Sequence, residues 1–139
     1  MIIFTRRELV NAWRGAQSAS QIATRTNAHR LLLFYAAECG LKAVYLKRSN
    51  VDLLEGEIGG QLKHDLNKVM ALLRIGKDLF LPTTLALNSV QKAGVAIDRR
   101  CSPDNLNQVW RYGGVLRAPD DVSVEEKLDE INAWIAKEI

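Results

Sequence analysis

The chain has 139 residues, 47% of them hydrophobic, and a formal net charge of +3 at pH 7, which is too small by itself to indicate nucleic-acid binding. Only two cysteines, Cys39 and Cys101, are present and they lie far apart, which argues against a disulfide framework or a zinc site; we expect a reduced, cytoplasmic protein with one domain over residues 1–139. The N-terminus lacks the features of a signal peptide, and Glu38 and Lys42 interrupt the longest apolar run before it reaches the roughly 20 residues of a membrane span.

The first predicted helix begins at a capping box formed by Thr5 and Glu8, whose side chains satisfy backbone N–H groups at the helix start. The pattern extends to about Ala23. Gly15 and the small residues 18–20 weaken the helical pattern and favour a break or a bend in this stretch.

A second helix is predicted from Asn27, as the N-cap, to Arg48, and apolar residues occupy nearly every face of it. Such a helix is typically surrounded by other helices, so we expect it at the centre of the fold. Glu38 and Lys42 stand four residues apart within it, in the order that favours a side-chain pair across one turn. Two interpretations stay open for this pair: an internal ion pair that serves the structure, or a ligand-facing site.

Residues 49–60 are rich in polar residues and glycine and predict a loop. A third helix, ending at Gly76, is predicted by apolar residues at offsets of four, three and four, namely Leu62, Leu66, Val69 and Leu73. A fourth is predicted over Leu85–Ala93, closed by Gly94.

Residues 94–121 are irregular apart from a short helix expected near Asn105–Trp110. The last helix is marked by a second capping box, formed by Ser123 and Glu126, and by one apolar face with Val124, Leu128, Ile131 and Ile135. No stretch shows the alternation typical of strands. The expected fold class is therefore all-α, a compact bundle of four to five helices around the buried central helix.

Charge is distributed unevenly along the chain. Residues 1–50 hold eight Lys or Arg and two Asp or Glu, whereas residues 101–139 hold four and eight. The basic excess near the N-terminus consists of Arg6, Arg7, Arg14, Arg25, Arg30, Lys47 and Arg48. Two outcomes are open for these side chains: a surface that attracts phosphates, or ion pairs with the acidic C-terminal helix of this chain or of a neighbour.

Candidate functional residues outside the central helix are few. His64 lies off the apolar face of the third helix, where a histidine either caps and bridges local structure or acts as a catalytic base. Arg111 and Tyr112 precede two glycines, and two interpretations are open: Arg111 and Tyr112 bind a phosphate and a base, or Trp110 and Tyr112 anchor the loop on the core. Neither histidine has companions at a recognised metal spacing, so we expect no metal and no cofactor.

Three segments together resemble the HEPN domain family: Tyr35–Leu46, with its Ala-Ala-Glu-x-x-x-Lys-Ala pattern, Leu62–Leu66, with His-Asp-Leu, and the later Arg111–Tyr112. The resemblance spans about residues 27–112. It implies a helical bundle, frequent homodimerisation, and a role with RNA or nucleotides in toxin–antitoxin or anti-phage systems, beside a partner enzyme or antitoxin. It also makes Glu38, Lys42, His64, Arg111 and Tyr112 the expected ligand-binding residues.

The ribonucleases of that family look alike in one motif, an arginine that is followed after four to six residues by a histidine. This chain departs from that motif. No arginine stands at that distance before His29 or His64, and Arg25 precedes His29 by one residue too few. We therefore expect a non-catalytic nucleotide- or RNA-associated module. The alternatives are a metal-independent ribonuclease in which His64, Arg111 and Tyr112 are the candidate catalytic residues, and a helical protein–protein interaction subunit.

Overall fold

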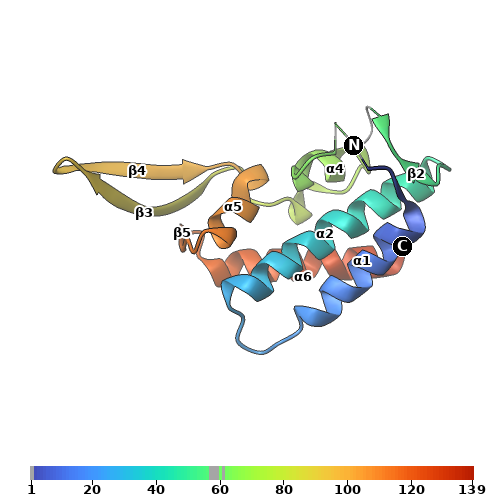
Figure 1. Cartoon of the computed structure of the whole chain (residues 1–139), viewed down its shortest axis with the longest axis horizontal. Coiled ribbons are helices and arrows are strands. Elements are labelled where there is room, and N and C mark those ends of the chain that lie inside the picture. Colours follow the sequence, from blue (N-terminus) through green and yellow to red (C-terminus); the bar gives the residue numbers. More distant parts are fainter. Residues whose placement is uncertain (1, 57–59, 61) are drawn as a thin grey trace.

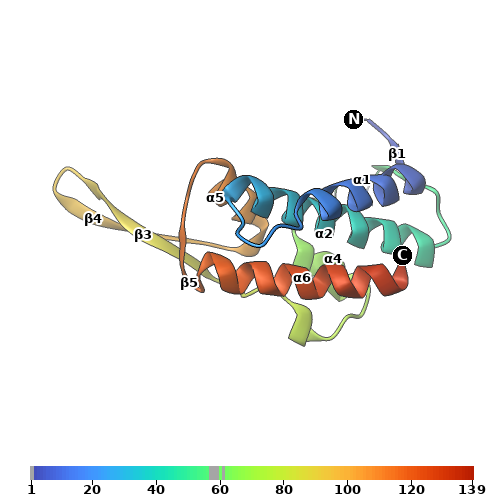
Figure 2. The same ribbon diagram turned by 90° about the horizontal axis from the view of Figure 1, so that it is seen from below.

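The computed structural model describes residues 2–56, 60 and 62–139 of the chain. Three long helices form the body, and α2 (Asn27–Arg48) lies between α1 (Arg6–Ala19) and α6 (Asp121–Glu138) (Figures 1 and 2). The short helices α4 (Leu66–Leu72) and α5 (Leu106–Arg111) also pack against α2. Among the helices of the described ranges, none is both long enough and apolar enough to cross a membrane.

Two small antiparallel sheets accompany the helices. β1 (Phe4–Thr5) pairs with β2 (Leu53–Leu54), and a three-stranded sheet has the order β4-β3-β5. Its strands are β3 (Leu85–Lys92), β4 (Val95–Cys101) and β5 (Leu116–Ala118), and two single 3-10 turns, η1 (Lys77–Leu79) and η2 (Pro103–Asn105), lie in the connections. The all-α prediction is therefore wrong, because the fold is a mixture of helices and antiparallel strands.

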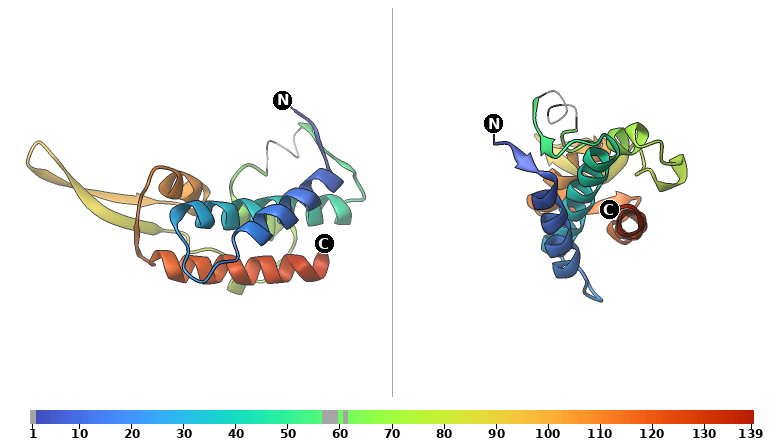
Figure 3. Two further views of the ribbon diagram at one scale, coloured as in Figure 1. Left: turned by 60° about the horizontal axis from the view of Figure 1, so that its bottom comes forward. Right: turned by 90° about the vertical axis from the view of Figure 1, so that its right-hand side faces the viewer.

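The prediction of the central helix is confirmed, with the same bounds. Leu33, Phe34 and Leu41 have no exposed surface, because α1, α4, α5 and α6 cover α2 from several sides (Figure 3). The predicted cap is displaced by one residue, since Thr26 rather than Asn27 is the N-cap. The Thr26 N–H donates a hydrogen bond to His29 Nδ1 over 3.1 Å, so the histidine takes the part that a glutamate plays in a capping box.

The first helix begins as predicted. The Glu8 N–H donates to Thr5 Oγ1 over 3.1 Å, and the Thr5 N–H donates to Glu8 Oε1 over 3.0 Å. The helix continues unbroken through Gly15 and ends at Ala19 instead of near Ala23. The buried Ser20 terminates it, because its hydroxyl turns back and donates to the Gln17 carbonyl over 2.8 Å.

The third predicted helix is shorter than its apolar pattern. Helix α4 starts only at Leu66, because the Asp65 carboxylate accepts from the Lys68 N–H over 3.1 Å and so caps the helix there. Leu62 and Leu73 are buried but lie outside the helix. The predicted loop at 49–60 contains strand β2, and its residues 57–59 lie outside the described residues.

The predicted helix over Leu85–Ala93 is wrong, because this segment is strand β3. It forms a long hairpin with β4 that projects from the body (Figure 1). Ala93 and Gly94, with φ values of 52° and 77°, form the tight turn at its tip. Two successive positive φ values give the turn the twist that antiparallel strands require.

Helix α5 confirms the short helix expected near Asn105–Trp110. In α6 the predicted apolar face is buried, but the predicted capping box is wrong. The helix begins at Asp121, and the Asp120 carboxylate accepts from the Ser123 N–H over 2.9 Å, so Ser123 already lies in the first turn.

The acidic helix α6 neutralises part of the basic N-terminal region. Arg25 donates two hydrogen bonds to the Asp129 carboxylate, over 2.8 and 3.0 Å, and Arg30 Nε donates to Glu125 over 2.7 Å. Arg48 pairs with the last turn of α6 at 3.4 Å. These three basic side chains therefore follow the second of the two outcomes that the sequence left open, pairing within the chain.

Candidate functional site

Glu38 is the centre of the candidate site and is only 9% exposed. Helices α4 and α5 both pack against α2, the helix that carries it (Figure 1). Glu38 Oε1 lies 3.8 Å from Lys42 Nζ, so the pair expected across one helical turn is present. The same oxygen lies 2.5 Å from His64 Nδ1. The sequence patterns place His64 in a different segment from Glu38 and Lys42, and the fold brings all three together.

His64 stands in the segment before α4, and its side chain is 52% exposed. An ionised carboxylate only accepts hydrogen bonds, so Nδ1 carries the hydrogen that points to Glu38. In the neutral ring this leaves Nε2 with an open lone pair that can accept a proton. The contact therefore fixes both the tautomer and the orientation of a half-exposed histidine.

Arg111 reaches the same face of α2 from the end of α5. Its Nη2 donates a hydrogen bond to the Tyr35 hydroxyl over 2.7 Å. This hydrogen bond raises the pKa of the Arg111 guanidinium above its ordinary value, and a second hydrogen bond, with Tyr112, adds to the rise. Tyr35 precedes Glu38 by three residues, so the two contact points lie on consecutive turns of one helix face.

Tyr35 lies in the HEPN-like segment but is not among the functional residues that the sequence predicts. Its spacing from Glu38 and Lys42, three and seven residues, was the signal that would have found it, because these offsets share one face of a helix. Tyr112 was among the predicted residues, and 77% of its surface is exposed. The loop-anchor interpretation thus does not hold for Tyr112, whereas Trp110 is buried and does hold the segment on the core.

A pocket of about 330 Å³ lies beside His64. Lys63 and Lys68 line it on one side, and Asn105 and Gln108 line it on the other. Gln108 stands three residues, about one helical turn, before Arg111 on α5. The pocket has both charge signs, because Asp65 and Asp104 also line it.

His29 and Arg25, the pair closest to the ribonuclease spacing, do not form a site. The His29 Nδ1 accepts from the Thr26 N–H, and the Arg25 guanidinium is bound by Asp129. The His29 side chain therefore stabilises the start of α2, and the Arg25 side chain stabilises the packing against α6.

The region of Glu38 also contains a cysteine, Cys39, and side chains of the types that bind metals. Within residues 2–56, 60 and 62–139, no three His, Cys, Asp or Glu side chains converge as a metal site would require. Burial raises the pKa of the Cys39 thiol to about 11, and the adjacent Glu38 carboxylate adds to the rise. Cys39 is therefore a neutral thiol at physiological pH and a poor nucleophile.

The arrangement offers a proton acceptor at His64, a guanidinium at Arg111, lysines at the pocket wall and an exposed aromatic ring at Tyr112. These groups are suited to a phosphate ester and to a stacked base. The HEPN resemblance stays a prediction. Comparison of the chain with protein-family models, with curated proteins and with solved structures finds no match.

Proposed function

We propose that this chain is a nucleotide- or RNA-associated module that holds a phosphate group over the face of α2 that carries Tyr35 and Glu38, between His64 and Arg111. The single observation that carries the proposal is the pair of polar links on consecutive turns of this helix, Tyr35 to Arg111 and Glu38 to His64. The two links fix a guanidinium and an imidazole along one line of the surface.

The burial of Glu38 supports a role for the site beyond packing. A carboxylate that is 9% exposed on an otherwise apolar helix costs several kcal/mol in lost hydration unless it has partners. Lys42, one helical turn away, would by itself supply a partner for the carboxylate, yet Glu38 also binds His64, whose ring is half-exposed. The buried ion pair thus serves to orient a group that faces the outside.

The exposed groups match the chemistry of a ribonucleotide. An arginine fork binds a phosphate through two parallel hydrogen bonds, and an exposed tyrosine such as Tyr112 stacks on a base without selecting its identity. The resemblance to HEPN domains supports a homodimer that works in a toxin–antitoxin or anti-phage system, in the cytoplasm and with a partner enzyme or antitoxin.

A metal-independent ribonuclease is a second candidate, and the 2.5 Å contact between His64 and Glu38 favours it. In that reaction His64 Nε2 takes the proton of a ribose 2′-hydroxyl. The 2′-oxygen forms a bond to the adjacent phosphorus as the bond from phosphorus to the 5′-oxygen breaks, and the 5′-oxygen takes a proton from water. The products are a 2′,3′-cyclic phosphate and a 5′-hydroxyl, and Arg111 stabilises the charge on the phosphoryl oxygens.

Binding is tested by fluorescence anisotropy with a labelled single-stranded RNA at fixed salt concentration. Arg111→Gln is expected to weaken binding by about tenfold or more, because a hydrogen bond between two charged groups contributes about 1.5–3 kcal/mol. Arg100→Gln is the matched control, since Arg100 is an exposed arginine on the projecting hairpin with the same formal charge. Equal affinities of the two variants would exclude the α2 face as the binding site.

Catalysis is tested by incubating the protein with total RNA in the presence of EDTA. Cleavage that His64→Ala abolishes and Arg100→Gln preserves supports the ribonuclease. Intact RNA together with binding that depends on Arg111 supports the non-catalytic module. Intact RNA with no binding leaves the third possibility, a helical interaction subunit, which would then be identified by its oligomeric state and its partners.

A further inference from the structure

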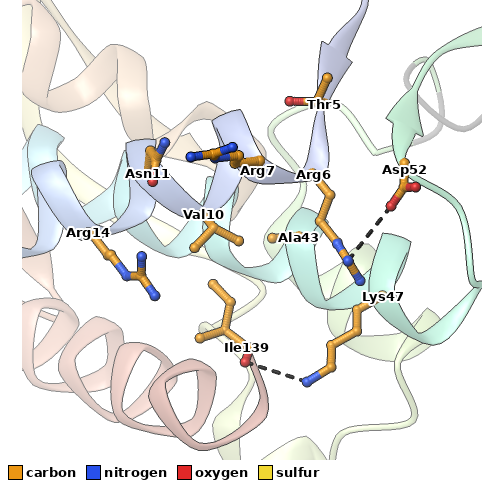
Figure 4. Close-up of a pocket in the computed structure, with 10 residues that line it drawn as sticks. All are labelled: Thr5, Arg6, Arg7, Val10, Asn11, Arg14, Ala43, Lys47, Asp52 and Ile139. Atoms are coloured by element: carbon orange, nitrogen blue, oxygen red, sulfur yellow. Dashed lines mark hydrogen bonds and ion pairs between the residues drawn. The ribbon is translucent and has the colours of Figure 1, made fainter.

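A second and larger pocket, of about 580 Å³, lies at the other end of the body from the hairpin. The start of α1, the last turns of α2 and the end of α6 surround it (Figure 4). This pocket, called here the α1 groove, contains no residue of the His64 pocket. Its volume lies in the range of sites that bind small molecules.

The α1 groove is lined by four cationic side chains, and α1 supplies three of them. Arg7 and Arg14 stand seven residues apart, which places them on one face of the helix about 10 Å apart along its axis. Asn11 lies between them on the same face. Arg6, at the start of α1, and Lys47, from α2, face the groove from its far side (Figure 4).

Two of these cations already have partners. Arg6 Nη2 lies 3.7 Å from the Asp52 carboxylate, in a pair that is exposed on both sides and therefore weak. Lys47 Nζ donates to the Glu138 carbonyl over 3.2 Å and to the main-chain oxygen of Ile139 over 3.5 Å (Figure 4). Both retain hydrogen-bond capacity toward the groove.

The other two, Arg7 and Arg14, have no carboxylate within 4.0 Å among the residues that the structure describes. The chain pairs Arg25, Arg30 and Arg48 with the acidic helix α6 and leaves these two facing one pocket. Asp52 is the single acidic side chain in the described lining.

The floor of the α1 groove is apolar and consists of Val10, Ala43 and Ile139. An apolar floor flanked by cations suits an anion that carries an organic group. No described lining residue is aromatic, so the groove offers no ring on which a base could stack. Recognition would therefore depend on the charged part of the ligand.

We propose that the α1 groove binds a small oligophosphate ester, a molecule with two or more linked phosphoryl groups and an organic substituent. Two arginines whose backbone positions lie about 10 Å apart along a helix present two guanidiniums, and a ligand with more than one anionic group can engage both. A single carboxylate or orthophosphate occupies one of them. This site is separate from the α2 face, so its existence does not depend on the function proposed there.

Isothermal titration calorimetry on the whole chain tests the site with tripolyphosphate, ATP, CTP and orthophosphate. We expect saturable binding of tripolyphosphate and of both nucleotides, with ATP and CTP alike, and much weaker binding of orthophosphate. The double variant Arg7→Gln/Arg14→Gln is expected to weaken tripolyphosphate binding by about tenfold or more, because each lost charge-assisted hydrogen bond is worth at least about one decade in affinity.

The matched control is Lys92→Gln/Arg117→Gln, which removes the same charge from exposed positions near the opposite end of the molecule (Figure 1). Arg7→Lys/Arg14→Lys retains the charge but loses the fork, and intermediate affinity is expected. The proposal is overturned if no oligophosphate binds or if both double Gln variants lose the same affinity.

Discussion

Gly40, in the middle of α2, is the position where a single methyl group gives the clearest test of the helix packing. A Cβ added there would lie 2.7 Å from Cγ2 of Ile135 on α6 and 2.7 Å from Cδ1 of Trp13 on α1. Trp13 cannot retreat freely, because its indole Nε1 donates a hydrogen bond to the buried Asn132 over 3.0 Å. Gly40→Ala is therefore expected to force α1 and α6 apart from α2.

Two effects of opposite sign decide the outcome. Replacing glycine by alanine inside a helix stabilises it by roughly 0.5–1 kcal/mol, since the unfolded chain loses less entropy on folding. Overpacking a close contact costs about 1–3 kcal/mol. Because the added methyl meets fixed groups on two sides, we expect a net loss of about 1–2 kcal/mol, which corresponds to a fall in Tm of roughly 4–8 °C.

Gly15 provides the matched control. It lies exposed within α1, and a Cβ there would meet nothing within 4 Å. Gly15→Ala is therefore expected to raise the free energy of unfolding by about 0.5–1 kcal/mol. Urea denaturation followed by circular dichroism measures both variants. If Gly40→Ala is as stable as Gly15→Ala, the close approach of the three helices is refuted.

Three further predictions concern stability and reactivity. Glu38→Ala is expected to destabilise the chain by about 2–4 kcal/mol in urea, since it leaves a largely buried Lys42 ammonium unpaired, and the double variant Glu38→Ala/Lys42→Met should recover much of the loss. A loss in the double variant equal to the sum of the losses in Glu38→Ala and Lys42→Met would mean that the pair is uncoupled. Ellman's reagent at pH 8 is expected to react with Cys101 before Cys39, whose pKa of about 11 keeps it a thiol until the chain unfolds; rapid reaction of both would contradict its burial. Hydrogen bonds from the N-cap residue lower the pKa of Glu8, so its stabilising effect is present above the ordinary carboxyl pKa and is lost as the pH falls through the lowered value. The Tm difference between the wild type and Glu8→Gln should accordingly shrink in acid, whereas a constant difference would speak against the capping box.

The sequence predicts those helices whose position is determined by residues close to them in the chain. The central helix followed from apolar residues on every face, and the start of α1 followed from the spacing of Thr5 and Glu8. The start of α6 was misplaced because Asp120 and Ser123 are both good capping residues, three positions apart. The sequence contains both options, and the hydrogen bond from the Ser123 N–H decides between them.

The hairpin was missed because its cause is not local. Leu85, Ala86 and Leu87 favour helix, but pairing with β4 and β5 determines their conformation, and those partners come later in the chain. The turn signal was weak, since alanine at position 93 replaces the usual asparagine or aspartate before Gly94. The contact between Glu38 and His64 could not be predicted either, although both are candidate functional residues. It depends on where the segment before α4 meets α2, which is not a local property of the sequence.

The ion pairs that tie α2 to α6 also determine when this domain can be completed during synthesis. Arg30 precedes its partner Glu125 by 95 residues, so at about 5–20 residues per second the ribosome needs roughly 5–20 s to deliver the carboxylate. For most of that interval α2, which is apolar on nearly every side, has been synthesised in full while α6 is missing. The nascent chain therefore carries an uncovered hydrophobic helix and unpaired arginines, which is the kind of surface that chaperones of the ribosome exit bind.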